Sequence, residues 1–422
     1  MANVFAPTDF AADAKPRTRS DAGAAEMCVA ALCLAQFSEP LFAAIAQSQG
    51  LTEPPGYARI FFLPVYGFLL WAILRQTRAA LTTALATPLL MALIALAFVS
   101  TTWSIDSGGT LRRSVWLALT MAFGLYLAWR YDWARMVQVI AGAFVVLVIG
   151  SFATTLIAPS VGIMPFEHPG AWSGLWTHKN TLGGLMALGV PIGVTAAIVA
   201  PERRKLWLAT AFGALLLVLL STSKTALLAS MIGLAVIAAG ALIRRGPLYA
   251  IVIATGASAL VIITASAFLL APEAIVAAFG RDLTFTGRTD IWHAAASAVD
   301  ARPWLGYGYY AFWLDENGPA FWIREAVRWE VASAHNGWLE LALGLGRIGV
   351  ALFALQFIAT LYRGARSVMD RIAGLWAPAF LAAFALYTLS ESHAVQANDL
   401  FWTIYVAVAA RLALDARAKR IS

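Results

Sequence analysis

Residues 333–340 read Ser-Ala-His-Asn-Gly-Trp-Leu-Glu, and they close a polar, aromatic segment that begins at Ala271. This segment of roughly sixty residues separates two runs of apolar spans, and it is much longer than an ordinary connection between elements. It carries five arginines and ends on a histidine at the predicted start of a helix. A long basic loop of this kind, in a chain of apolar spans, predicts an enzyme that works at a membrane surface.

The composition places most of the chain in lipid. Of the 422 residues, 60% are hydrophobic and only 13% are charged, whereas soluble proteins are about half apolar and a quarter charged. The fold class expected is therefore an all-α, polytopic membrane protein. The net charge of +7 is expected to set topology and to meet anionic lipid, and no nucleic-acid partner is expected. Cys28 and Cys33 both lie in the first apolar span and support neither a disulfide framework nor a metal cluster.

The apolar runs predict about twelve transmembrane helices. They are expected near residues 25–47, 57–75, 81–101, 111–129, 136–158, 181–200, 206–221, 223–243, 248–271, 335–362, 373–390 and 398–414. The first of them is interrupted by Glu39-Pro40. The predicted regions are a disordered cytoplasmic tail (1–24), helices one to nine (25–271), a large periplasmic loop with short helices (272–334), helices ten to twelve (335–414) and a basic cytoplasmic tail (415–422).

Charge predicts the orientation of these spans. With the N-terminus in the cytoplasm, 19 of the 30 lysines and arginines lie in short cytoplasmic loops or tails, as the positive-inside rule requires. Both termini are therefore expected in the cytoplasm. Topology does not require the other eleven on the outer side, and an anionic ligand at the outer leaflet supplies a reason for them. They are Arg59, Arg112, Arg113, Lys179, Lys224, Arg281, Arg288, Arg302, Arg324, Arg328 and Arg347.

Two of these residues are lysines at predicted helix starts. Lys224 follows an apolar run directly; it either snorkels to the interface or contacts a ligand. Lys179 lies in the polar stretch 176–180, where Thr177 or Asn180 is expected to cap the next helix. The start of that helix either presents N–H groups to an anion or is a plain cap beside interfacial tryptophans.

The long segment supplies an arginine and a histidine. Arg288 suits bidentate capture of phosphate, and Asp290 is expected either to orient it or to begin a helix that runs to about residue 299. The alternative is a surface Arg–Asp pair of little energetic weight. Residues 302–308 are expected to form a structural turn that folds the segment back, and residues 345–349 to break the next helix outside the membrane.

His335 is predicted at a helix N-terminus, where the helix dipole disfavours the imidazolium form. A neutral imidazole near neutral pH suits a general base. Glu340, about one turn further, either holds the ring or a nearby cation, or is solvated. No metal site is expected, because the five histidines are scattered and no His-x-x-x-His pair occurs. Polar residues 390–393 and 398–399 also lie on the outer side without a predicted role.

The order of the motifs resembles a known family across the chain from about residue 90 to the end. The motifs are Trp103-Ser104-x-Asp106 with Arg112; Gly174-Leu175-Trp176-Thr177-His178-Lys179-Asn180-x-x-Gly183; Ser221-Thr222-Ser223-Lys224-Thr225; Gly287-Arg288-x-x-x-Trp292; Pro303-x-x-Gly306-x-Gly308; and His335-Asn336-x-x-Leu339-Glu340. This pattern resembles the O-antigen ligase and O-antigen polymerase (Wzy-type) superfamily.

The resemblance implies a metal-independent glycosyltransferase of the bacterial inner membrane that has a periplasmic active site, needs no cofactor, and uses a glycan on undecaprenyl diphosphate as donor. The family's basic pair for the diphosphate would correspond to Lys224 and Arg288, and its histidine to His335. Many ligases have arginine where this chain has Lys224, and the Ser-Lys-Thr and His-Lys-Asn forms look more like the exopolysaccharide-polymerase branch. That favours a polymerase that acts on a lipid-linked acceptor.

The predicted catalytic residues are therefore His335 as base and Arg288 and Lys224 as diphosphate clamp. Two rivals remain. An O-antigen ligase would use lipid A-core as acceptor, and a lipid-linked-glycan transporter would usually place its polar groups near the membrane midplane. A chain-length regulator or other polysaccharide-assembly proteins are the protein partners expected. Predicted substrate-binding residues are Arg112, His178, Lys179, Asn180, Asp290, Asn336 and Glu340.

Overall fold

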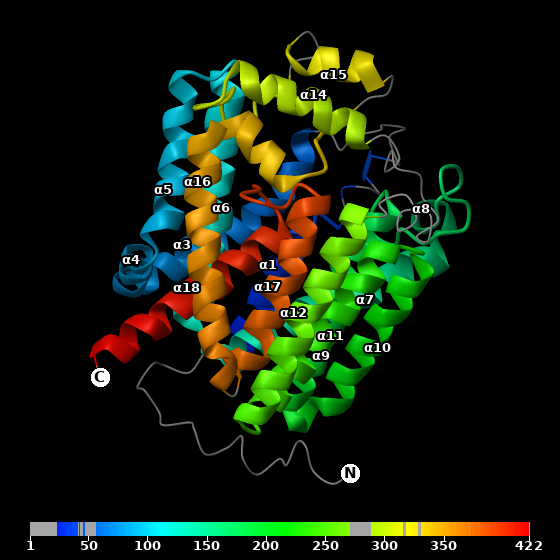
Figure 1. Cartoon of the computed structure of the whole chain (residues 1–422), viewed down its shortest axis with the longest axis vertical. Coiled ribbons are helices and arrows are strands. Elements are labelled where there is room, and N and C mark those ends of the chain that lie inside the picture. The colour runs from blue at the N-terminus through cyan, green and yellow to red at the C-terminus, as the bar shows by residue number, and fades with distance from the viewer. Residues whose placement is uncertain are drawn as a thin grey trace.

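The computed structural model describes residues 23–40, 42, 45–46, 56–270, 288–314, 318–327, 331–370 and 372–421. Apart from one isolated β-bridge between Ile163 and Trp172, the regular structure of these residues is helical, so the predicted all-α class is confirmed. The helices pack into one elongated bundle, with α14 and α15 across one end and the C-terminus toward the other (Figure 1).

The helices, in chain order, are α1 (Ala24–Gln36), η2 (Gly56–Phe62), α3 (Leu63–Arg75), α4 (Thr77–Ala86), α5 (Pro88–Val99), α6 (Ser107–Arg130), α7 (Trp133–Ile157), α8 (Pro159–Gly162), α9 (Lys179–Val199), α10 (Arg204–Leu220), α11 (Lys224–Ile243), α12 (Pro247–Leu270), α14 (Arg288–Ala301), α15 (Ala320–Val327), α16 (Gly337–Arg366), α17 (Ala373–Ser390) and α18 (Leu400–Ile421).

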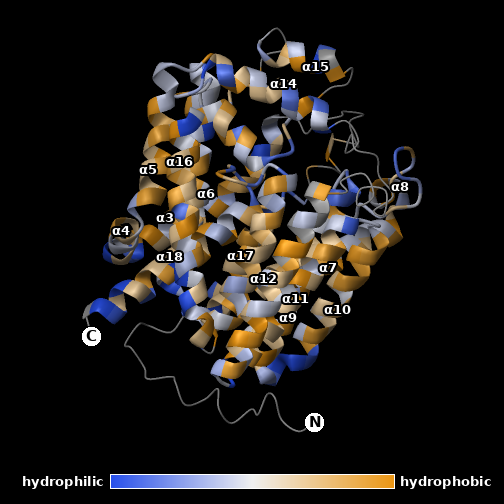
Figure 2. Cartoon of the chain, viewed as in Figure 1, coloured by the Kyte–Doolittle hydropathy of each residue, from blue (hydrophilic) through white to orange (hydrophobic). Residues whose placement is uncertain are grey.

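The chain is a multi-pass membrane protein by its apolar helices. Each of the twelve predicted spans overlaps a helix or a pair of helices, but only six stretches of the described residues are long and apolar enough to cross a membrane. The bent pair α4 and α5, which turns by 91°, makes a seventh if it counts as one span. Figure 2 shows apolar residues along α7, α10 and α12, and hydrophilic residues gathered toward the ends of the bundle.

The helices that fall short of a full span do so for simple reasons. The helix α10 has 17 residues and α1 has 13, fewer than the roughly twenty that a bilayer requires. The helix α18 carries Arg411 and Asp415, which pair with each other within its length. The predicted count of twelve spans therefore stays a prediction, and six or seven is the number that length and composition support among the described residues.

The long polar segment is held against a break in α16. Gly346 has a φ of +63° and interrupts the helix, which frees backbone groups of the turn before it. The carbonyl oxygens of Leu343 and Gly344 accept hydrogen bonds from the backbone N–H groups of Tyr307 (2.8 Å) and Gly308 (3.0 Å). The turn at residues 302–308 thus satisfies the groups that the break exposes. The predicted turn and the predicted break are both confirmed, and the position of the break outside the membrane stays a prediction.

A second motif anchors the same turn from the other side. The indole Nε1 of Trp103 donates to the carbonyl oxygen of Leu305 at 3.0 Å. The backbone N–H of Ile105 donates to the carbonyl oxygen of Tyr307 at 3.0 Å. The Asp106 carboxylate caps α6 by accepting from the N–H of Gly109 at 2.9 Å. Residues 103–106 therefore anchor the long segment to the start of α6.

The break at Gly346 generates a stability prediction. A Cβ added at Gly346 would lie 2.2 Å from the carbonyl oxygen of Trp304, and the positive φ disfavours any L side chain. We expect Gly346→Ala to destabilise the fold by about 2 kcal/mol or more, seen as a lower thermal unfolding midpoint in detergent. Gly256→Ala in α12 is the matched control, because no atom lies within 4 Å of its Cβ position. Equal midpoints for the two variants would show that the break carries no strain.

Candidate functional site

Two lysines meet at one cavity because the starts of α9 and α11 pack very closely. A Cβ added at Gly183, in the second turn of α9, would lie 2.7 Å from the Oγ of Ser221 and 3.0 Å from the Cβ of Ala226 in α11, so glycine permits this close approach. Lys179 is the first residue of α9 and Lys224 the first of α11. Both line a cavity of about 280 Å³, and the Nζ of Lys179 donates to the Oγ1 of Thr222 at 3.2 Å.

Arg288 reaches the same cavity from the start of α14. Its Nη1 donates to the carbonyl oxygen of Ser390 at 2.6 Å, and its Nη2 donates to the Oε1 of Glu391 at 2.9 Å. These two contacts use two of the five donors of a guanidinium. Three cations from three separate elements therefore face one carboxylate, and the net positive charge of the cavity favours a multiply charged anion.

The carboxylate of Glu391 joins Arg288 to His335. Its Oε2 lies 3.1 Å from the Nδ1 of His335, and the Glu391 side chain is only 26% exposed. Although burial opposes ionisation, the hydrogen bond from His335 and the charge of Arg288 lower the pKa of Glu391 to about 2. A stable carboxylate at Nδ1 assigns the proton of a neutral ring to that atom and leaves Nε2 as the basic nitrogen.

His335 itself lies one residue before the N-cap of α16 rather than in the first turn of the helix. It has a φ of +48°, and Asn336 caps α16 by accepting hydrogen bonds from the N–H groups of Trp338 (3.0 Å) and Leu339 (3.1 Å). The predicted substrate-binding residue Asn336 is thus engaged in capping the helix. A left-handed conformation at a histidine is unusual, and strain of this kind concentrates at functional sites.

Glu340 is buried and holds protein groups rather than the histidine ring or a cation. Its carboxylate accepts from the Nε1 of Trp313 at 3.0 Å and from the backbone N–H of Ala334. Because Ala334 directly precedes His335, Glu340 fixes the backbone that presents the histidine. It is a positioning residue in this structure, and the predicted solvated alternative is excluded.

The residue that caps α9 is His178, not Thr177 or Asn180. The Nδ1 of His178 accepts the backbone N–H of Asn180 at 3.1 Å, and burial lowers the pKa of His178. His178, His168 and Glu167 lie close enough to share a metal ion. Metal binding through Nε2 would require a proton on Nδ1 and would break this cap, so the arrangement is better suited to a neutral Nε2–H donor. Asn180 lines the cationic cavity, and its predicted contact with a substrate stays a prediction.

Of the ten predicted site residues, four line the cationic cavity: Lys179, Asn180, Lys224 and Arg288. The other six are not among its lining residues: Arg112, His178, Asp290, His335, Asn336 and Glu340. The exposed Asp290 is not the partner of Arg288, which pairs with Glu391 instead; the predicted helix is present as α14. The guanidinium of Arg112 lies 5.8 Å from the ring centre of Trp116, and Arg112 is not among the residues that line the cavity.

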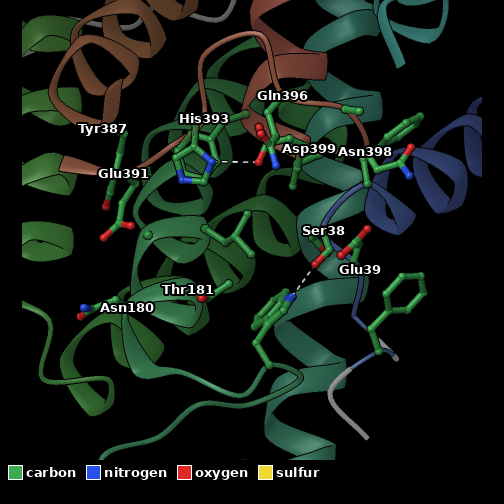
Figure 3. A pocket seen from close by; sticks show the side chains of 18 of the residues that line it. Ser38, Glu39, Asn180, Thr181, Tyr387, Glu391, His393, Gln396, Asn398 and Asp399 are labelled. Carbon is green, nitrogen blue, oxygen red and sulfur yellow. Dashed lines mark hydrogen bonds and ion pairs between the residues drawn. The ribbon is translucent and has the colours of Figure 1, made fainter. Parts of the chain in front are cut away.

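A second cavity of about 320 Å³ adjoins the cationic one, and Asn180, Tyr387 and Glu391 line both. Figure 3 shows its polar side chains, with the Nδ1 of His393 paired to the Oδ2 of Asp399 at 2.8 Å. Burial alone would lower the pKa of His393, but the Asp399 carboxylate raises this pKa above its usual value. Glu391, His393 and Asp399 received no predicted role. The polar residues 390–393 and 398–399, at and between the ends of the last two predicted spans, were the signal for all three.

A multi-pass, all-α membrane protein with a cationic cavity at one end of its bundle is the class that this geometry defines. Residues 209–354 match the family model described as O-Antigen ligase. Lys224, Arg288 and His335 all lie within the matched residues. The chain is also 26% identical over 324 residues to the exopolysaccharide production protein ExoQ of Rhizobium meliloti (strain 1021), with 72% of each chain covered. These matches confirm the predicted resemblance to the O-antigen ligase and polymerase superfamily.

The lowered pKa of Glu391 generates a prediction on stability and pH. A folded-state pKa of about 2 against a reference of 4.5 corresponds to about 3 kcal/mol of stability. This contribution is complete above the unfolded pKa and is lost as pH falls from about 4.5 through 2. We expect Glu391→Gln to unfold at a lower temperature than the wild type at pH 6, and the difference to shrink toward pH 2. A difference that does not change with pH would contradict the assigned pairing.

Proposed function

We propose that the chain is an inner-membrane glycosyltransferase that transfers a glycan from undecaprenyl diphosphate to a sugar hydroxyl in the periplasm. The observation that carries this proposal is the convergence of Lys179, Lys224 and Arg288 on one cavity of about 280 Å³. A lipid diphosphate is an anion of the size and charge that three such donors favour, and arginine suits its paired oxygens.

The clamp lowers the barrier by stabilising the leaving group. As the bond between the anomeric carbon and the diphosphate oxygen breaks, its electron pair stays on the diphosphate. The fixed cations of Lys224 and Arg288 then stabilise the negative charge that develops on the diphosphate in the transition state. Stabilising charge that develops only in the transition state is the most effective use of preorganised electrostatics. Lys179 adds a third charge from the start of α9.

His335 activates the acceptor in this mechanism. The Nε2 of His335 takes the proton of the acceptor hydroxyl while its oxygen forms the new bond to the anomeric carbon. Glu391 holds Nδ1–H and stabilises the imidazolium that forms, a role known for carboxylates behind catalytic histidines. Attack from the face opposite the diphosphate inverts the anomeric centre.

The acceptor distinguishes two versions of the function. A polymerase would extend another lipid-linked repeat, and the relation to an exopolysaccharide production protein together with Lys224 in place of arginine favours this version. An O-antigen ligase would use lipid A-core as acceptor. The match to a family model described as O-Antigen ligase supports this alternative. The polymerase is expected to work with a chain-length regulator or other polysaccharide-assembly proteins.

Reconstitution tests the function directly. The purified protein is incubated with a synthetic lipid-linked repeat, with lipid A-core, or with both, in the presence of a metal chelator. We expect polymer on undecaprenyl diphosphate, identified by mass analysis and undiminished by the chelator. Product only on lipid A-core would establish the ligase, and transport of intact substrate without transfer would refute the enzyme.

The base assignment makes its own prediction. His335→Ala should lower turnover by about 10²–10⁴-fold, because the acceptor hydroxyl loses its proton acceptor while the diphosphate clamp stays in place. His293→Ala is the control, since His293 lies exposed on the same segment, in α14. Normal polymer from a folded His335→Ala protein would remove the histidine from the mechanism.

The mechanism also requires that α14 and α15 face the periplasm and that both termini face the cytoplasm, as twelve spans would arrange. In a background with Cys28→Ser and Cys33→Ser, we expect Asp290→Cys to react with an impermeant thiol reagent in spheroplasts. Lys419→Cys, at the other end of the bundle, should react only after the membrane is opened. The reverse pattern would invert the topology and place the site on the cytoplasmic side.

A further inference from the structure

A second pair of cations lines a separate cavity of about 160 Å³. The guanidinium of Arg59 lies 4.2 Å from the ring centre of Trp116, and that of Arg113 lies 5.1 Å from the ring centre of Tyr310. Stacking on an aromatic face orients a guanidinium and leaves its N–H edge available. Arg59 comes from η2 and Arg113 from α6, so two elements far apart in the sequence build this cavity.

These two arginines lack a carboxylate partner within the described part of the chain. Neither forms an ion pair there, and the Nε of Arg113 is buried without a hydrogen-bond partner. Glu39 lines the same cavity, but one carboxylate leaves the two guanidiniums with net positive charge. A buried charged donor without a partner is costly, and an anion in this cavity removes that cost.

The cavity continues the site already described. It shares Glu39, Gln396 and Asn398 with the central cavity of about 320 Å³, which in turn shares Glu391 and Asn180 with the cationic cavity of Lys224 and Arg288. Figure 3 shows Glu391 and Asn180 toward one side of the central cavity, and Glu39 and Asn398 toward the other. The three cavities therefore form a row with cations at both ends and polar side chains between them.

The backbone around the second pair is strained in the manner of a functional site. Glu39, Tyr310 and Asn398 line the cavity and have φ angles of +53°, +57° and +56°. Left-handed conformations at residues other than glycine are held only where the surrounding structure over-determines them. Here three of them, from three separate segments of the chain, surround one small polar space.

We propose that Arg59 and Arg113 bind a phosphate or diphosphate group of the acceptor, whose glycan then lies in the central cavity. This inference rests on the proposed transferase function. It gives the donor and the acceptor one anionic group each at opposite ends of the row, so that the acceptor sugar lies between them and reaches the donor at the end that holds Glu391 and His335. A lipid-linked repeat would supply a diphosphate, and lipid A-core would supply a phosphate.

Binding stoichiometry tests the proposal without requiring turnover. Undecaprenyl diphosphate is titrated onto the full-length protein in detergent and counted by native mass spectrometry. We expect two bound molecules per chain for the wild type, one for Arg113→Gln and one for Lys224→Gln. Arg347→Gln is the matched control with two, because Arg347 also lies near a tryptophan ring (5.8 Å) yet pairs with Asp300 at the surface.

One bound molecule in the wild type, or two in Arg113→Gln, would overturn the second site while leaving the donor site intact. Arg59→Gln repeats the test from another element, so the inference stays testable if one variant does not fold. Two molecules bound without any transfer in the reconstituted assay would keep the site and reject the transferase, which separates the two failures.

Kinetics identify the source of the anion. Arg113→Gln should raise the KM for the acceptor about ten- to hundredfold, the value of one or two charged hydrogen bonds, and leave the KM for the donor unchanged. Lys224→Gln should do the reverse. The effect should appear with a lipid-linked repeat for a polymerase, with lipid A-core for a ligase, and vanish with an acceptor on a neutral lipid linker. An equal effect on the neutral acceptor would show that Arg113 does not bind its phosphate.

Discussion

One carboxylate, Glu391, holds the proposed active site together. It lies at the end of α17 and receives Arg288 from the start of α14 and His335 from the segment before α16. A buried carboxylate with a single partner would be costly, whereas two charged or polar donors compensate its loss of water. The same contact orients the guanidinium toward the cavity and selects the tautomer of the imidazole. The arginine of the proposed diphosphate clamp and the proposed base are therefore one electrostatic unit rather than two neighbouring features.

The long polar segment can place Arg288 only because it is anchored at its middle. The break at Gly346 exposes backbone groups inside a helix that otherwise lies in an apolar bundle, and residues 302–308 satisfy them. The Trp103 motif holds the other face of the same turn. Behind the turn, Glu340 ties the backbone at Ala334 to the buried Trp313. These contacts explain why motifs spread over more than two hundred residues of the sequence serve one site.

Hydropathy predicted the helices well, because the period and length of apolar runs are local properties of the sequence. The two lysines were predicted for the same reason, since each lies at the start of an apolar helix, although only Lys224 follows a short connection. No role was predicted for Glu391, because its partners Arg288 and His335 lie 103 and 56 residues away in the sequence. Contacts between residues so far apart produce no periodic pattern in the sequence. The cap at His178 lies one or two residues from the predicted Thr177 or Asn180, since several polar neighbours compete for the same free N–H groups. The helix predicted to open at His335 begins at Gly337. The number of membrane spans depends on helices whose lengths lie close to the roughly twenty residues that a bilayer requires. The hydropathy pattern alone does not decide whether such a helix crosses the membrane.

The positions of the strained residues connect the two ends of the site. His335, Glu39, Tyr310 and Asn398 all have positive φ, and the last three line the cavity of Arg59 and Arg113. Strain that served packing alone would be relieved by substitution with glycine or by a small shift of a loop, at little cost to the bundle. Its concentration around cavities with cations at both ends instead indicates that the backbone is held to present polar groups inward. The proposed reaction between two anionic lipid-linked molecules needs such a geometry, because each substrate must be held by its charge while the glycans meet between them.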